Sequence, residues 1–193
     1  IILHISNDHY ADGGPWNSFM IGEEKNMTNE TNFKTSLEFF VFGSIFIMAL
    51  YHFLLYLLRR EKKATLFFSI FCALISLRIL LTGERFLFIN TDINWILLVR
   101  LNFLTFYLSL IIFVLFIIKL FPEESIKIIN KIYFTIGSIF CILIIVLSPL
   151  LLQKTLTPYQ LISVMIGIYI FYILIKSVIN KRDGASIFLL GYI

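Results

Sequence analysis

Two arginines lie within strongly apolar stretches of the sequence, Arg78 and Arg100. A charge inside a membrane is costly unless the side chain reaches the surface or pairs with an opposite charge. The acidic residues Glu38, Glu84 and Asp92 fall near the same predicted membrane surface and could be the partners. Two interpretations stay open: a structural ion pair, or a polar cluster that binds an anionic ligand or couples an outer domain to the helices. Arg100 favours the second interpretation more than Arg78 does, because it lies deeper.

Histidine is the other residue type that could carry chemistry here. His52 lies alone in an apolar stretch beside Tyr51 and Tyr56, where it could hydrogen-bond between helices or relay protons. His4 and His9 come much earlier in the sequence, and a metal site needs three or four converging ligands. The sequence also contains no HExxH, GxSxG or Walker motif. It therefore predicts no catalytic residues, no metal, no cofactor and no enzymatic activity of its own.

The composition is that of a membrane protein. Of the 193 residues, 59% are hydrophobic and 15% are charged, and the mean hydropathy is +0.91. A soluble domain of this size would need more polar residues to cover its surface, whereas lipid solvates an apolar exterior. The net charge of +4 comes from cations between the apolar stretches, so the expected partner is the lipid bilayer and not nucleic acid. Cys72 and Cys141 each fall inside an apolar stretch and imply no disulfide framework.

Apolar stretches of membrane-spanning length organise most of the chain. A helix needs about 20 apolar residues to cross the hydrocarbon core. The predicted spans are about residues 37–58, 64–81, 93–120, 132–152 and 159–179, with the start of a sixth at 185–193. Within them, Gly43 and Gly137 could let neighbouring helices approach closely. The predicted fold is therefore an all-α multi-pass membrane bundle over residues 37–193.

The residues before the first span differ in composition from the rest. Residues 1–22 combine a short alternating stretch with turn signals at Ser6-Asn7-Asp8 and Gly13-Gly14-Pro15. This pattern indicates the last strands of a β-domain whose bulk lies upstream. Residues 23–36 are polar and acidic, which predicts a juxtamembrane linker. We therefore expect the sequence to be a piece of a longer protein.

Lysine and arginine are unevenly distributed between the two sides of the predicted bundle. Ten of them lie on one side, within 59–63, 119–131 and 176–182, and four lie on the other side. Because basic residues are retained in the cytoplasm, the side with ten is predicted to be inside. The N-terminal segment is then outside the plasma membrane.

Two stretches of the sequence carry a resemblance to known proteins. The residues concerned are Ser6-Asn7-Asp8-His9-Tyr10, Gly13-Gly14 and Trp16 to Gly22 in the first stretch, and Gly43, Tyr51-His52, Arg59, Leu77-Arg78, Gly83 and Glu84 in the second. The first resembles the end of the extracellular β-sandwich of the bacterial seven-transmembrane receptors with diverse intracellular signalling modules. The second resembles the opening of their membrane domain.

This resemblance implies a sensor in the bacterial inner membrane. Such a receptor has a carbohydrate-binding-like outer domain, seven helices and a cytoplasmic output module such as a kinase, cyclase or phosphatase. The implied partners are an extracellular small molecule, with carbohydrate as a candidate class, the output module and a second copy in a homodimer. The predicted topology agrees, because an outside start followed by seven crossings puts the C-terminus inside.

The residues themselves favour a receptor over two other functions. The alternative is a transporter or channel that holds a small anionic solute at Arg78 and Arg100. Transporters commonly contain inverted repeats and helices interrupted near the midplane, and neither pattern is visible in the sequence. An intramembrane enzyme is disfavoured because its acidic or histidine-rich constellations are absent from the sequence. The predicted function is to pass an extracellular signal to an output domain that these residues do not include.

Overall fold

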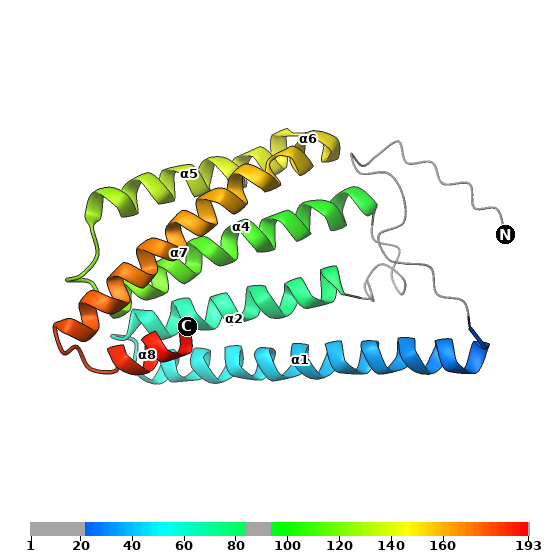
Figure 1. Cartoon of the computed structure of the whole chain (residues 1–193), viewed down its shortest axis with the longest axis horizontal. Helices are drawn as coiled ribbons and strands as arrows, with labels where there is room; N and C mark the ends of the chain where they lie inside the picture. Colours follow the sequence, from blue (N-terminus) through cyan, green and yellow to red (C-terminus); the bar gives the residue numbers. More distant parts are fainter. Residues whose placement is uncertain (1–21, 84–93, 193) are drawn as a thin grey trace.

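The computed structural model describes residues 22–83 and 94–192, and within these residues all regular structure is helical (Figure 1). Five stretches of helix are long and apolar enough to cross a membrane. The helices are α1 (Glu24–Leu58), α2 (Lys63–Thr82), α4 (Trp95–Leu120), α5 (Lys127–Val146), α6 (Pro149–Lys154), α7 (Leu156–Ile179) and α8 (Ala185–Tyr192). The multi-pass helical bundle is confirmed for this part of the chain. The predicted β-strands of residues 1–22 fall almost wholly outside the described residues.

Helix α4 is the centre of the bundle. It packs against α2 on one side and against α5, α6 and α7 on the other, while α1 packs against α2 (Figure 1). A larger share of α4 is buried than of any other described span, and α1 has the smallest share. Two apolar cores lie along α4, one near Ile117 and Leu174 and one near Phe103 and Leu152.

The two ends of the bundle differ in charge. We call one the basic end; it comprises the α1–α2 connection, the α4–α5 loop at residues 121–126 and the α7–α8 turn at residues 180–184. At the other end, which we call the opposite end, α1 and α4 begin and α5 is followed by α6 (Figure 1). These names carry no assumption about which end faces the cytoplasm.

Helix α1 extends beyond the predicted first span, because it begins at Glu24 and continues unbroken to Leu58. Its 35 residues correspond to about 52 Å of helix, against about 30 Å of hydrocarbon core. The polar residues predicted to form a linker are therefore the first turns of the same helix. An ion pair of 2.7 Å between Lys34 and Glu30 supports them, and so does Glu24 in the first turn, where a negative charge is favourable. The polar composition predicted a juxtamembrane linker and did not indicate a helix, because these residues have no apolar face.

Two prolines set the boundaries after α5. The predicted fourth span of 132–152 is divided, since α5 runs from Lys127 to Val146 and α6 begins at Pro149. Ser148, which precedes Pro149, is extended, as expected for a residue before proline. Pro158 lies within the first turn of α7, where its missing N–H costs no intrahelical hydrogen bond.

Gly137 of α5 leaves room for a side chain of α4 to pack directly against the α5 backbone. A Cβ atom at Gly137 would lie 2.8 Å from Cδ1 of Ile111, whereas a Cβ atom at Gly43 would meet nothing within 4 Å. The prediction of a close helix approach is therefore confirmed at Gly137 and wrong at Gly43.

We expect Gly137→Leu to lower the free energy of unfolding by about 1 to 3 kcal/mol, because the new side chain overlaps Ile111 and separates α5 from α4. The measurement is unfolding in mixed micelles by increasing sodium dodecyl sulfate, followed by circular dichroism. Gly43→Leu is the matched control and should leave the transition unchanged. An equal loss in both variants would contradict the assigned packing.

Candidate functional site

Arg78 joins α2 to α4 through neutral groups. Its Nη1 donates to the backbone oxygen of Asn102 at 2.9 Å and to the side-chain oxygen of the same residue at 3.1 Å. Its guanidinium carbon lies 4.8 Å from the centre of the Phe106 ring, in cation–π geometry. Carbonyl oxygens and an aromatic face thus hold this half-buried charge, whereas the sequence had suggested an acidic partner. The contact fixes the level of α2 against α4.

Arg100 lies on a different face of α4 from the Arg78 contact. Asn102 receives Arg78, and residues two positions apart point to opposite sides of a helix. The Nε of Arg100 is buried and has no hydrogen-bond partner in the described part of the chain. The Arg78 contact at Asn102 and Arg100, two residues before it, therefore lie on different faces of α4.

Glu38 reaches the end of the helix that carries Arg78. Its carboxyl group lies directly against Gly83, where a Cβ atom would overlap the carboxyl atoms. The hydroxyl of Thr82 donates to the backbone oxygen of Arg78 at 2.8 Å, in the same last turn of α2. Glu38 of α1 thus lies against the C-terminal end of α2, next to the last turn that begins at Arg78. Glu84 and Asp92, the other acids considered, lie outside the described residues.

His52 contacts α2 by ring packing. Its Nδ1 lies 2.9 Å from the backbone oxygen of Met48, within α1 itself. Its ring meets Phe68 of α2 edge to face, with 4.6 Å between the ring centres. The α1–α2 hydrogen bond at this level is made instead by Ser69, which donates to the backbone oxygen of Ala49 at 2.8 Å. The interhelical hydrogen bond considered for His52 is therefore replaced by an aromatic contact.

A pair of buried tyrosines joins α4 to the α6–α7 connection, and sequence reasoning did not single it out. The hydroxyls of Tyr107 and Thr155 lie 2.6 Å apart, and the Tyr159 hydroxyl donates to the Tyr107 backbone oxygen at 2.9 Å. Both tyrosines are fully buried. Buried tyrosines need a partner for the hydroxyl, but the sequence does not reveal which one.

A second cluster missed by sequence reasoning closes the basic end. Glu124 is almost fully buried, at 3% exposure, in the α4–α5 loop. It accepts from Asn180 Nδ2 at 3.0 Å and from Arg182 Nε at 3.3 Å, and Lys176 Nζ lies 3.5 Å away. Glu123 also pairs with Arg182. We call Glu123, Glu124, Lys176, Asn180 and Arg182 the clasp, since they hold the α7–α8 turn on the α4–α5 loop.

The end of α7 directs the clasp residues onto Glu124. The amide of Arg182 donates to the Ser177 oxygen at 2.9 Å and that of Lys181 to the Val178 oxygen at 3.0 Å. These are the two hydrogen bonds of a Schellman cap, with Lys181 in the left-handed conformation at φ 53°. Glycine usually takes this position, so the sequence carried no signal for a helix end of this type.

Tyr169 makes a further link between α7 and the start of α5. Its hydroxyl accepts from the Ile126 amide at 2.7 Å and donates to the Asn130 side-chain oxygen at 2.9 Å. The amide N–H groups at the start of a helix have no hydrogen-bond partner within the helix. The Tyr169 hydroxyl provides such a partner for the Ile126 amide at the start of α5. Together with the clasp, it ties the α4–α5 loop to α7 at two places.

The comparison with protein families decides the identity of this bundle. The family described as 7TM diverse intracellular signalling matches residues 34–193. The chain belongs to this family. The match begins within α1 and runs to the end of the chain. The contacts above are therefore contacts within the membrane domain of the 7TM diverse intracellular signalling family. Comparisons with curated proteins and with solved structures gave no match.

We expect Glu124→Gln to lower the free energy of unfolding by about 1 to 3 kcal/mol, because a neutral amide cannot accept from two donors as strongly while staying buried. Glu123→Gln is the control, since that side chain is 70% exposed and exposed pairs contribute little. Both variants would be unfolded with dodecyl sulfate as above. Equal transitions for the two would show that Glu124 does not hold the basic end.

Proposed function

We propose that this chain is the membrane part of a receptor that passes an extracellular signal to a cytoplasmic output module. The observation that carries the proposal is α1, an unbroken 35-residue helix in the membrane domain of a signalling family. A continuous helix transmits a displacement or rotation along its length, whereas a flexible linker would absorb it. A change in a domain next to Glu24 would thus reach the basic end at Leu58.

Polar contacts in series would carry the change from α1 to α7. Ser69 links α2 to α1, Arg78 links α2 to α4, and Tyr159 links α7 to α4. The clasp then links α7 to the α4–α5 loop. Such contacts are either made or broken, which suits a bundle with two discrete arrangements of its helices. The stimulus must favour one arrangement by binding it more tightly than the other.

The positive-inside rule supports an orientation for this receptor. The basic end carries most of the lysines and arginines, so we place it in the cytoplasm and the start of α1 outside the bacterial inner membrane. The α7–α8 turn with its clasp would then lie on the side of the output module. The resemblance to sensory receptors suggests an extracellular small molecule, with carbohydrate as a candidate class, a kinase, cyclase or phosphatase as output, and a homodimer.

Arg100 supports the alternative of a transporter or channel for a small anionic solute. A buried guanidinium nitrogen without a partner in the described residues could bind an anion. Arg78 does not add to this support, because its contacts lie on the other face of α4. Uptake of labelled anions into vesicles that contain the protein would separate the alternative from the receptor.

We expect Asn32→Pro in the full-length receptor to abolish the response to stimulus while leaving expression and insertion unchanged. Proline in a helix interior costs about 3 kcal/mol and kinks the helix, and Asn32 is an exposed residue before the predicted span. Signalling output in cells is the measurement, with Asn32→Ala as control. A normal response in the proline variant would rule out transmission through a rigid α1.

We expect a periplasm-dependent phosphatase reporter to be active when fused after Gly83 and inactive when fused after Lys63. The two residues lie at opposite ends of α2, so a single crossing separates them. The reverse pattern of activity would overturn the proposed orientation.

A further inference from the structure

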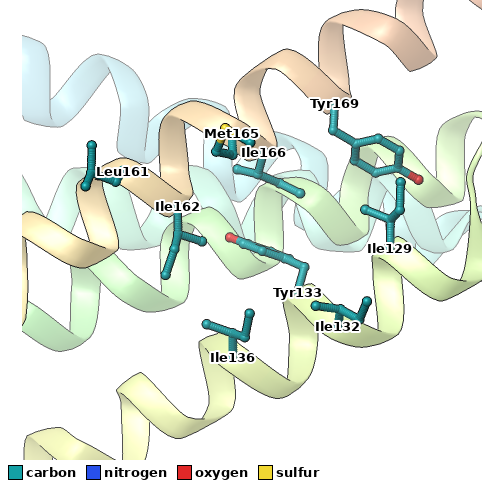
Figure 2. Close-up of a pocket in the computed structure, with 9 residues that line it drawn as sticks. All are labelled: Ile129, Ile132, Tyr133, Ile136, Leu161, Ile162, Met165, Ile166 and Tyr169. Atoms are coloured by element: carbon teal, nitrogen blue, oxygen red, sulfur yellow. The ribbon is translucent and has the colours of Figure 1, made fainter.

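A ligand-sized cavity lies between α5 and α7 (Figure 2). Its volume is about 460 Å³, within the range of about 300 to 1,000 Å³ that small-molecule sites have. Nine residues line it, and seven of these are aliphatic side chains or methionine. Leu161 and Met165 belong to the lining and are also exposed on the outside of the bundle. The cavity therefore opens sideways, toward the space that lipid fills.

Two fixed contacts between α5 and α7 frame the cavity. Near the basic end, the Tyr169 hydroxyl donates to Asn130 at 2.9 Å. Nearer the opposite end, the rings of Phe140 and Tyr159 pack with 5.0 Å between their centres. Between these contacts the backbones of α5 and α7 do not pack closely, and the lining extends from Ile129 to Ile136 on α5. Because contacts join α5 to α7 on both sides of the cavity, the fold itself maintains the gap between these two helices.

The hydroxyl of Tyr133 is the unused polar group of this cavity. Tyr133 is only 4% exposed, and its hydroxyl has no hydrogen-bond partner in the described part of the chain. Figure 2 shows its ring projecting from α5 across the cavity toward α7. The hydroxyl of Tyr159 lies close to it, but that hydroxyl gives its own proton to the Tyr107 backbone oxygen, and its contact with Tyr133 falls short of hydrogen-bond geometry. A buried donor left without an acceptor is unfavourable in a site that lipid, not water, can enter.

Tyr169 provides the comparison within the same cavity. It also lines the cavity, but its hydroxyl both accepts from the Ile126 amide and donates to Asn130. Its polar capacity is therefore used by the protein. Of the two hydroxyls that line the cavity, the one on Tyr133 is the donor left for a ligand.

We propose that this cavity binds an elongated apolar molecule dissolved in the membrane that carries a hydrogen-bond acceptor, such as a carbonyl, within its apolar body. The apolar lining receives the body of the molecule, and Tyr133 donates to its acceptor. A plain hydrocarbon chain fits the lining but leaves the Tyr133 hydroxyl unpaired, so the acceptor is what selects the ligand. The molecule enters from the lipid, past Leu161 and Met165.

The probes are a long-chain ketone with its carbonyl at the middle carbon and the alkane of the same length. Thermal unfolding of the whole chain in detergent micelles would be recorded with each probe, since a bound ligand raises the Tm. We expect the ketone to bind wild type about three- to tenfold more tightly than the alkane, as one hydrogen bond would give. The ketone carbonyl band in the infrared should also show a hydrogen-bonded component.

Matched variants separate the two parts of the proposal. Tyr133→Phe should remove the advantage of the ketone and its hydrogen-bonded infrared band, whereas Tyr172→Phe, on an exposed tyrosine outside the lining, should retain both. Met165→Trp should weaken both probes by filling the cavity. Ile168→Trp, at an equally lipid-exposed residue of α7 that does not line the cavity, should leave them unchanged.

Three results would overturn the proposal. Equal binding of ketone and alkane to wild type would mean that an ordinary acyl chain fills the cavity. Survival of the ketone advantage in Tyr133→Phe would place the hydrogen bond elsewhere. Equal weakening by Met165→Trp and Ile168→Trp would mean that the probes act through the micelle and not through the cavity.

Discussion

The inability of lipid to hydrogen-bond is the constraint on which this bundle depends. In the hydrocarbon core a polar group finds a partner within the protein or remains unpaired at high cost. The guanidinium of Arg78 therefore binds Asn102 of the next helix, and Tyr159 binds the backbone oxygen of Tyr107. Each contact joins residues far apart in the sequence. The same contacts that satisfy polar groups thus fix which helices are neighbours and at what level they meet.

Apolar packing could not set this order alone. Lipid tails compete with leucine and isoleucine side chains for the surface of a helix, so apolar contacts hold helices together without strong preference for a partner. Close packing adds specificity where a small residue permits it, as Gly137 does beside Ile111. The polar contacts add further specificity, because hydrogen bonds are directional and form only between particular groups. They form a connected series from α1 through α2 and α4 to α7, and the central α4 belongs to most of them.

The two ends of the bundle use polar residues in different ways. At the basic end, Glu124 is buried among donors from α7 and the α7–α8 turn. Arg182 and Lys176 neutralise its negative charge, and the Asn180 amide adds a hydrogen bond. Toward the opposite end, Arg78 is held by neutral oxygens and a ring. Between the ends, α5 and α7 separate and leave the Tyr133 hydroxyl beside an apolar gap. A domain with tied ends and a loosely packed middle can change its helix arrangement without losing its fold.

The sequence by itself determined the membrane class, the multi-pass helical bundle and the family, because these follow from local composition and from residues read in order. The predicted spans lie close to the helices where apolar residues dominate. Residues 24–36, predicted to be a juxtamembrane linker, also belong to α1, because a polar helix has no apolar periodicity to reveal it. Arg78 was recognised as a costly charge, but its partner was expected to be an acid. Only the tertiary structure decided that Asn102 receives Arg78 and that Glu124 meets Arg182. The physical reason is that a partner is set by the rotation and level of each helix about its axis, and these depend on contacts that no local stretch of sequence contains.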